Sequence, residues 1–470
     1  MSTWNKILFL FLALLVFACQ QAKEKNAVET TLEMNFSGAK GEVKIMTLDP
    51  GHFHAALVQK FMYTQVDSVV SVYAPVGPDV DGHLARIDGF NSRIENPTSW
   101  NQQVYRGADF FEKMISEKPG NVMVVSGNNA KKTEYILSAV ENGINVLADK
   151  PMIISPSEFE QLKKAFEIAE QKGVLLYDIM TERYEISTIL QKSLSQIPEV
   201  FGQLKKGSLE DPAVTKESVH HFFKYVSGNP LIRPSWFFDV SKQGEGIVDV
   251  NTHLVDLIQW ECFPEQIIDY DNEIEIVTAK RWPTNLTPAE FNKVTGLNSY
   301  PKELLKDVND DSILSVYSNG EINYKIKGIH AKASVIWNYQ APEGAKDTHY
   351  SIMRGTKSNL VIRQGKEQSY KPVLYVEPIE GIDELDFEEE LQKAIETVNR
   401  QYSGVEIEKS ETGWTVTIPE KYKLGHEAHF TQVTEKYLEY LKNGKLPNWE
   451  VPNMLAKYYT TTQAYIKSME

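Results

Sequence analysis

The feature that most constrains this chain is a regular alternation of short apolar runs and amphipathic segments between residues 43 and 179. The apolar runs have the length of buried strands, and the segments between them repeat apolar residues at helical spacing. This pattern predicts a parallel sheet covered by helices on both faces, the doubly wound α/β fold, whose ligands bind at the carboxyl ends of the strands. The predicted strands are 43–48, 69–74, 122–126, 144–148 and 174–179, and the predicted helices are 54–62, 108–115, 130–142 and 157–171.

After about residue 200 the pattern changes to the alternation that is typical of antiparallel strands. Residues 313–328 alternate around Asn319-Gly320, a dipeptide that favours a tight hairpin turn. We therefore expect a mostly antiparallel open sheet with helices against one face, an α+β domain. Further strands are predicted at 333–339, 358–365 and 373–378, and helix returns within 426–470.

The N-terminus carries a separate signal. Lys6 precedes 12 apolar residues (7–18), too few to span a bilayer but typical of a signal peptide. The run ends in a lipobox-like Val-Phe-Ala-Cys, so we expect lipidation of Cys19; an ordinary signal peptide with a chance cysteine is the alternative. Residues 1–19 are then the leader and 20–41 a polar tether. These features predict an exported lipoprotein of the periplasm or cell envelope, held at the membrane only by its lipid.

Length and composition narrow the remaining classes. A chain of 470 residues agrees with two domains, which we place at 42–180 and 181–470. The net charge of −15 argues against a nucleic-acid partner, which requires a basic surface. Cys19 and Cys262, the two cysteines of the sequence, exclude a disulfide-stabilised scaffold. Substrates are expected to be neutral or held by individual basic side chains.

The first strand–helix turn, LDPGHFHAA (48–56), is where a dinucleotide-binding fold carries G-x-G-x-x-G. With Gly51 as the middle glycine, Asp49 and His54 occupy the outer two positions. The middle glycine is the one that lets the backbone approach a pyrophosphate, so its retention favours nucleotide binding. A simple turn in which Pro50 and Gly51 supply the geometry is the alternative.

The ends of two other strands also bear on nucleotide binding. Ala74-Pro75 stands where an acid usually follows the second strand, and Asp79 or Asp81 is the nearest carboxylate that could replace it. The polar segment 126–129, Ser-Gly-Asn-Asn, follows the strand at 122–126 and is either a set of nucleotide contacts or an ordinary polar turn.

Two polar clusters stand out against apolar surroundings. The strand at 144–148 ends in Asp149-Lys150-Pro151, a charged pair and a rigid imide. A hundred residues later, QGEGIVDVNTHLVDLIQW (243–260) enters an apolar helix through two glycines. The polar residues of this helix fall on a single stripe, which either faces water or lines a cleft. The stripe comprises Asp249, His253, Asp256 and Trp260.

The combination of Asp-Lys-Pro at 149–151 with G-E-G-x-x-D-x-x-x-H-x-x-D at 244–256 resembles the Gfo/Idh/MocA family of NAD(P)-dependent sugar oxidoreductases. The resemblance covers roughly residues 42–470 and implies a Rossmann domain followed by an open-sheet domain. Residues 348–365 are similar to the subgroup with an oxidoreductase C-terminal domain, common among exported proteins of Bacteroidetes-like Gram-negative bacteria.

The resemblance implies the site residues. The family's catalytic lysine falls on Lys150, its aspartate on Asp249 and its histidine on His253. Two departures concern the cofactor more than the chemistry: Asp149 replaces the usual glutamate, and Glu245 replaces the second glycine of the helix entry.

These groups suit the oxidation of a secondary alcohol. His253 can accept the hydroxyl proton because imidazole titrates near neutrality. Asp249, one turn away, can orient that imidazole. Lys150 can donate a hydrogen bond to the developing oxyanion, and Pro151 keeps it out of helical geometry so that it points into the crevice. We therefore expect oxidation of a sugar or glycoside, with a 3-keto sugar as one candidate product. The expected cofactor is tightly bound and recycled NAD or NADP, NAD being favoured.

Further contacts are predicted from position. A metal is not predicted, because the pair His426 and His429 has metal-like spacing but no carboxylate placed beside it in the sequence. The predicted cofactor contacts are Gly51, His52, Phe53, His54, Ser126, Asn128, Asn129, Asp149 and Lys150. The predicted substrate contacts are Arg183, Tyr184, Arg233 and Trp236.

Two other functions fit the same sequence. A transient keto sugar acidifies the neighbouring C–H, so elimination and readdition would cleave a glycoside without net redox change. Alternatively, the loss of the first-turn glycines agrees with a non-catalytic carbohydrate-binding lipoprotein. By resemblance to the family, the open sheet also suggests a homo-oligomer.

Overall fold

The computed structural model describes residues 36–226 and 229–470. The predicted leader, Cys19 and most of the predicted tether lie outside these residues. Within them, no helix combines the length and the hydropathy that a bilayer-spanning segment requires.

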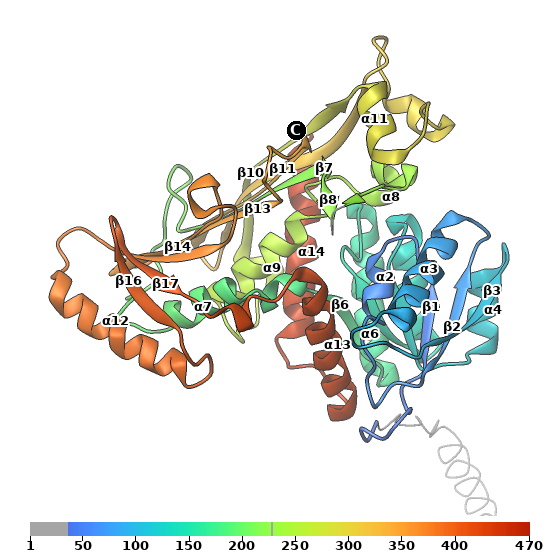
Figure 1. The fold of residues 1–470 in the computed structure, drawn as a ribbon, viewed down its shortest axis with the longest axis horizontal. Helices are drawn as coiled ribbons and strands as arrows, with labels where there is room; N and C mark the ends of the chain where they lie inside the picture. Colours follow the sequence, from blue (N-terminus) through green and yellow to red (C-terminus); the bar gives the residue numbers. More distant parts are fainter. Residues whose placement is uncertain (1–35, 227–228) are drawn as a thin grey trace, which may run out of the picture. The chain divides into compact units, whose positions relative to one another are not determined.

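The first half of the chain forms the predicted doubly wound sheet (Figure 1). In the described residues this sheet has six strands in the order β3-β2-β1-β4-β5-β6, and every neighbouring pair is parallel. Its strands are β1 (Ile45–Leu48), β2 (Val69–Ala74), β3 (Asn101–Arg106), β4 (Val122–Val125), β5 (Asn145–Asp149) and β6 (Leu176–Ile179). The helices between them are α2 (His54–Leu57), α3 (Pro78–Ser92), α4 (Phe110–Glu117), α5 (Lys132–Glu141) and α6 (Phe159–Lys172).

Helix α3 and strand β3, which lie between β2 and α4, were not predicted from the sequence. Helix α3 buries only Val80, His83 and Ile87 and contains two glycines, so its apolar stripe is weak. Strand β3 lies at the edge of the sheet with no fully buried residue, and its polar sequence gives no strand signal. Helix α2 was predicted too long, because it ends at Leu57 and turns follow it.

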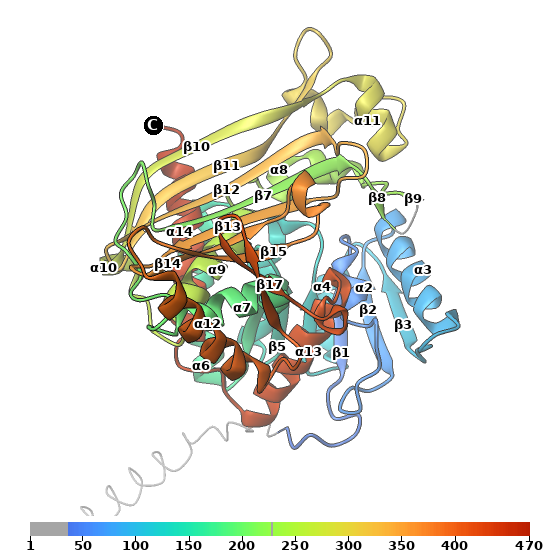
Figure 2. The same cartoon turned by 60° about the vertical axis from the view of Figure 1, so that its left-hand side comes forward.

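The second half forms the expected mostly antiparallel sheet (Figure 2). Its nine strands in the described residues have the order β10-β11-β12-β7-β13-β14-β15-β17-β16, and only β12 and β7 pair in parallel. The strands are β7 (Val214–Phe223), β10 (Ile274–Leu286), β11 (Leu314–Ile326), β12 (Ile329–Gln340), β13 (Thr348–Arg354), β14 (Ser358–Arg363), β15 (Val373–Pro378), β16 (Glu406–Ser410) and β17 (Gly413–Thr417). The accompanying helices are α7 (Ile186–Ser195), α8 (Val240–Gln243), α9 (Asn251–Cys262), α10 (Tyr270–Glu273), α11 (Pro288–Thr295), α12 (Glu384–Asn399), α13 (His426–Asn443) and α14 (Glu450–Lys467).

The predicted hairpin at Asn319-Gly320 is wrong. Strand β11 runs straight through this dipeptide, and the chain turns at Lys327 and Gly328, both of which have positive φ. Gly320 is needed for close packing instead, since a Cβ there would lie 2.6 Å from the Cβ of Ile247. The Asn319 side chain donates to the Trp282 carbonyl (3.0 Å) and accepts from the Trp337 amide (2.7 Å), so it stabilises neighbouring strands.

The two closing helices complete the core of the first sheet, although they follow the second sheet in sequence. Phe430, Val433 and Tyr437 of α13 and Met454 and Tyr458 of α14 belong to the same buried cluster as the parallel strands. At the start of the described chain, Phe36 packs against this cluster as well. The chain therefore passes from the first sheet to the second and back.

Candidate active site

Lys150 and Asp249 form the link between the two sheets. Lys150 directly follows β5, and Asp249 lies two residues before α9. Their Nζ and Oδ1 atoms are 2.6 Å apart although 99 residues separate them in sequence. Both side chains are largely removed from water, with 11% and 7% exposed. The structure thus brings together two of the three predicted catalytic residues.

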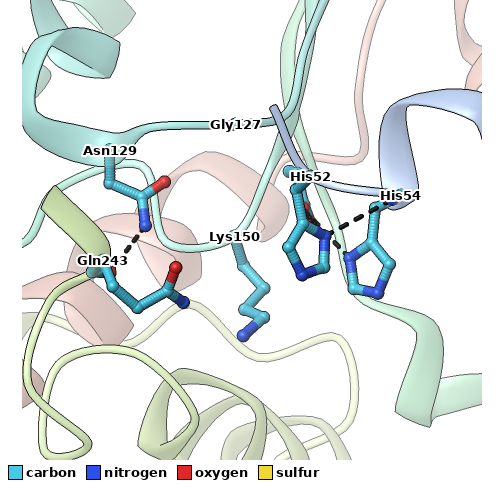
Figure 3. A pocket seen from close by; sticks show the side chains of 7 residues that line it. His52, His54, Gly127, Asn129, Lys150 and Gln243 are labelled. Carbon is cyan, nitrogen blue, oxygen red and sulfur yellow. Dashed lines mark hydrogen bonds and ion pairs between the residues drawn. The ribbon is translucent and has the colours of Figure 1, made fainter. Parts of the chain in front are cut away.

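A cavity of about 220 Å³ opens beside Lys150, at the carboxyl ends of the parallel strands (Figure 3). This is the edge at which doubly wound folds bind their ligands. The lining comes from the first turn, from the ends of β4 and β5, and from α8. It consists of His52, His54, Gly127, Asn129, Asp149, Lys150 and Gln243.

A second cavity of about 280 Å³ adjoins the helix entry that carries Asp249. Three aromatic side chains, Phe222, Phe237 and Trp337, form part of its wall. Gln243 lines both cavities and donates to Asp249 Oδ2 at 2.9 Å. The Lys150–Asp249 pair therefore stands between a cavity at the strand ends and a cavity with an aromatic wall.

His253 lies in the first turn of α9, and its Nδ1 is buried without a hydrogen-bond partner among the described residues. Burial, followed by the nearby charge of Lys150, lowers the pKa of His253 to about 3, so the imidazole is neutral at physiological pH. The predicted pairing of Asp249 with His253 is not formed. The Asp249 carboxylate is bound by Lys150 and Gln243 instead, so it orients the lysine.

The first turn keeps the backbone geometry of a glycine-rich turn without most of the glycines. Asp49 adopts a positive φ of 46°, and burial together with the charge of Asp79 raises its pKa to about 6. A Cβ on Gly51 would lie 3.2 Å from Asp79 Oδ2 and 3.3 Å from Trp236 Cζ2. Trp236 Nε1 also donates to Asp79 Oδ2 at 2.9 Å. Trp236, predicted to contact substrate, therefore covers the first turn.

In the segment after β4, each of the predicted cofactor contacts Ser126, Asn128 and Asn129 forms a hydrogen bond within the protein. Ser126 Oγ donates to Asp149 Oδ2 at 2.8 Å, and the Asn128 side chain accepts from the Ala130 amide at 2.9 Å. Asn129 Nδ2 donates to the Gln243 carbonyl at 2.7 Å, while its Oδ1 is buried without a partner in the described part of the chain. This segment joins the first domain to the helix entry of the second.

Three other predicted contacts are held within the protein. Phe53 and Tyr184 pack against the first core, and burial raises the pKa of Tyr184 to about 12. Arg183 is 8% exposed and binds Asp256 through Nε (2.6 Å) and Nη2 (2.7 Å) and Glu450 through Nη1 (3.0 Å). Buried carboxylates therefore give this guanidinium a structural role, and its contact with substrate stays a prediction.

Arg233 packs behind two aromatic residues that line the second cavity, Phe237 and Trp337. Its guanidinium lies over the rings of Phe237 (4.5 Å) and Trp337 (5.3 Å) and donates to the carbonyls of Phe222 and His221. It thereby holds the aromatic wall in place, and burial lowers its pKa to about 10.

Two site residues were missed from the sequence. Gln243 gave no signal because its role depends on the meeting of the two domains. Lys132 is fully buried and donates to the carbonyls of Asp149 (2.8 Å) and Pro151 (3.1 Å), and burial lowers its pKa to about 8. In sequence Lys132 is one of two adjacent lysines at a helix start, where a solvated side chain is the usual expectation.

Two family models match the chain. One, described as "Oxidoreductase family, NAD-binding Rossmann fold", matches residues 50–178, and the other, described as "Putative oxidoreductase C terminal domain", matches residues 190–469. The fold and its site thus define an oxidoreductase with an NAD(P)-binding Rossmann domain. The chain belongs to the Gfo/Idh/MocA oxidoreductases that carry this C-terminal domain, which confirms the family predicted from the sequence.

Solved structures and one curated enzyme are similar to this chain. A crystal structure described as "a putative oxidoreductase from Parabacteroides merdae" is 60% identical, with a TM-score of 0.91 over 93% of this chain and 99% of that one. Levoglucosan dehydrogenase in complex with NADH and levoglucosan is 12% identical, with a TM-score of 0.56 over 91% and 96% of the two chains, a likeness of fold. The scyllo-inositol 2-dehydrogenase (NADP(+)) of Bacillus subtilis is 23% identical over 146 residues, 31% of this chain and 36% of that enzyme. That match spans about a third of the curated relative.

The residues at the strand ends fit a nicotinamide dinucleotide in their chemistry. Two buried polar atoms, Asn129 Oδ1 and His253 Nδ1, have no partner among the described residues, and Lys150 supplies a cation beside them. Gly51 retains the position at which a backbone approaches a pyrophosphate. In the present arrangement Trp236 and Asp79 cover Gly51, so a nucleotide at the turn requires the indole to move.

Proposed function

We propose that this protein is an NAD-dependent oxidoreductase that oxidises a secondary hydroxyl of a sugar or glycoside, with a cofactor that remains bound and is recycled. The observation that carries the proposal is the Lys150–Asp249 pair, held at 2.6 Å between the strand-end cavity and the aromatic-walled cavity. Aromatic faces pack against the apolar faces of sugar rings, and the named relatives act on levoglucosan and on an inositol.

The chain's own residues supply orientation and proton handling. When bound, a nicotinamide supplies the hydride acceptor. Lys150, held by Asp249 and Gln243, donates a hydrogen bond to the substrate oxygen as negative charge develops there. His253 is neutral, the form that a general base requires, and its unpartnered Nδ1 can accept the hydroxyl proton.

Asp79 supports NAD over NADP. Asp79 stands in the first turn of α3, shortly after β2, where this fold usually places its ribose-binding acid. A carboxylate there can bind ribose hydroxyls and repels a 2′-phosphate. We expect Asp79→Ser to reduce the preference for NAD, measured as the ratio of affinities for the two nucleotides.

The nucleotide itself provides the first test. The purified protein is denatured, and released NAD(H) or NADP(H) is identified by absorbance and mass. We expect NAD(H) in near-stoichiometric amount. No released nucleotide, and none taken up on addition, would contradict the proposal and favour the carbohydrate-binding alternative.

The catalytic test replaces Lys150. We expect Lys150→Met to lower kcat by about 10²-fold or more while nucleotide binding is kept, because a donor to the developing oxyanion is lost. Lys164→Met is the matched control, since that lysine is 57% exposed and pairs with Glu141 at 3.4 Å, outside the site. Products are followed by mass: a keto sugar supports net oxidation, and a cleaved glycoside supports transient oxidation. Near-wild-type turnover of Lys150→Met would rule out this role.

We further propose that the protein is exported and anchored through a lipid on Cys19. Labelled palmitate should be incorporated into the wild type and into Cys262→Ser, and should be lost in Cys19→Ser. Equal labelling of the two variants would contradict the anchor. A homo-oligomer formed through the open sheet is part of the same proposal and is tested by the mass in solution.

A further inference from the structure

Three potential metal ligands line the strand-end cavity together: His52, His54 and Asp149. Figure 3 shows the two histidines side by side. Their ligand atoms all lie within 4.8 Å of one another. His54 Nδ1 is 3.0 Å and His52 Nδ1 is 3.8 Å from the same carboxylate oxygen, Oδ2 of Asp149. Ligand atoms about 2.1 Å from a common ion lie at most about 4.2 Å apart, so both distances suit one ion.

We propose that His52, His54 and Asp149 form a binding site for a divalent transition-metal ion, with coordination positions open toward the cavity. Two imidazoles and one carboxylate are a ligand set that zinc and ferrous sites use, leaving positions for water or a substrate oxygen. The spacing His-x-His puts both rings at the first turn, and the parallel sheet brings Asp149 to them from the end of β5.

The cations beside the site leave the Asp149 carboxylate available as a ligand. Lys132 donates to the backbone carbonyls of Asp149 (2.8 Å) and Pro151 (3.1 Å). Lys150, the nearest cation on the cavity wall, is paired with Asp249, which reduces its repulsion of a metal ion.

The far side of His54 supplies a second, independent observation. His54 Nε2 faces His426 Nε2 at 3.5 Å, and His426 Nδ1 lies 3.3 Å from Glu182 Oε1. If a proton on Nδ1 of His54 binds Asp149, two Nε2 lone pairs face each other unless His426 carries an extra proton. With a metal ion on Nδ1, His54 donates from Nε2 to His426, which donates from Nδ1 to Glu182. Such an outer chain from ligand to carboxylate is the usual support of a metal-bound histidine.

Two existing contacts would be replaced, one of them the 3.0 Å contact of His54 Nδ1 with Asp149 Oδ2. The His54 amide donates to His52 Nδ1, but at 3.3 Å this bond is long. Asp149 Oδ2 also accepts from Ser126 Oγ at 2.8 Å, a contact that a metal-bound carboxylate can retain. The competing arrangement, in which the 3.0 Å contact of His54 with Asp149 is an ordinary hydrogen bond, makes no demand for a metal.

The test measures metal binding and not activity. Purified protein is stripped with a chelator and titrated with Co²⁺, followed by its visible absorption, and with Zn²⁺, followed by calorimetry. We expect one equivalent of each metal to bind. Less than a tenth of an equivalent at micromolar metal would overturn the proposal.

Variants identify the ligands. We expect His52→Gln and Asp149→Asn each to weaken Co²⁺ binding by at least 10²-fold, and His426→Gln, outside the ligand set, to weaken it 10- to 100-fold. His220→Gln is the matched control, because His220 contacts Asp347 in the second domain, and it should bind metal as the wild type does. Circular dichroism verifies folding, and His52→Gln decides the question if Asp149→Asn does not fold. Unchanged affinity in His52→Gln would overturn the site, and nucleotide release from the wild type is unaffected by either outcome.

Discussion

At the scale of single residues, burial decides the protonation state of His253. Its Nδ1 has no partner among the described residues, and Lys150, which is paired with the Asp249 carboxylate, lies nearby. Desolvation and a neighbouring cation both disfavour the imidazolium. The site therefore pairs a fixed cation with a neutral base, an arrangement that depends on the packing around both.

This arrangement predicts how stability depends on pH. The pKa of His253 is about 3 in the folded protein and about 6.5 in the unfolded chain, so the unfolded state binds more protons between these values. Wild-type stability should therefore fall as the pH drops through this window. In His253→Gln this contribution is absent, so the slope should be shallower by up to about 1.4 kcal/mol per pH unit.

Urea unfolding at pH 7.5, 6, 5 and 4 measures both slopes, at pH values that run from above the window between about 3 and 6.5 into its lower half. At the highest pH neither state protonates the imidazole, so that point provides the reference for any pH-independent effect of the substitution. Parallel curves for the two proteins across the series would contradict a depressed pKa of His253.

At the scale of elements, glycines set how closely the helix entry approaches the second sheet. A Cβ on Gly246 would lie 1.8 Å from the Ser318 carbonyl oxygen, and one on Gly320 would lie 2.6 Å from Ile247 Cβ. Strand β11 and the entry to α9 thus touch through backbone atoms. This contact positions Asp249 and His253, which come directly afterwards in the chain.

Gly246→Ala should therefore separate the strand from the helix entry. We expect a loss of about 1–3 kcal/mol or more in the free energy of unfolding, because backbone atoms must shift to admit the methyl group. Gly89→Ala is the matched control: a Cβ there meets nothing within 4 Å, and alanine within α3 should stabilise by about 0.5–1 kcal/mol. Equal thermal midpoints for the two variants would contradict the close contact.

At the scale of the whole described molecule, buried ion pairs tie the last helix, α14, to the first sheet and to α9. Lys457 of α14 is fully buried and binds Asp178 of β6 at 2.6 Å and Asp256 of α9 at 3.0 Å. Arg183 joins the same Asp256 to Glu450. The cluster therefore spans the first sheet, the catalytic helix and the chain's last helix.

Lys457→Met should leave two buried carboxylates short of a cation. We expect a loss of about 3–5 kcal/mol in the free energy of unfolding, because an uncompensated charge remains inside the protein. Lys393→Met, which removes a 55% exposed lysine from a surface pair, should leave the free energy of unfolding almost unchanged. Denaturant midpoints distinguish the two, and a Lys457→Met protein as stable as the wild type would contradict the network's role.

The sequence alone determined the parts of this protein that repeat a local pattern. The alternation between 43 and 179 predicted the parallel sheet, because buried strands and amphipathic helices each require their own spacing of apolar residues. The motifs at 149–151 and 244–256 identified the family, because their glycines and charged residues are unusual in apolar surroundings. The polar edge strand β3 and the weakly amphipathic α3 were not predicted, because neither repeats apolar residues at the spacing of a buried strand or helix.

The tertiary structure decided what each polar group does. Asn319-Gly320 has the local preference of a turn, yet neighbouring strands and Ile247 hold it in an extended strand. Asp249 is bound to Lys150 and not to His253, and Arg183 forms ion pairs with Asp256 and Glu450. Such partners lie a hundred or more residues away or on another element, and local sequence carries no information about them. Hydrogen bonds and ion pairs in a buried site are chosen by what the packed fold brings within about 3 Å, and that is settled only when the two sheets and the closing helices meet.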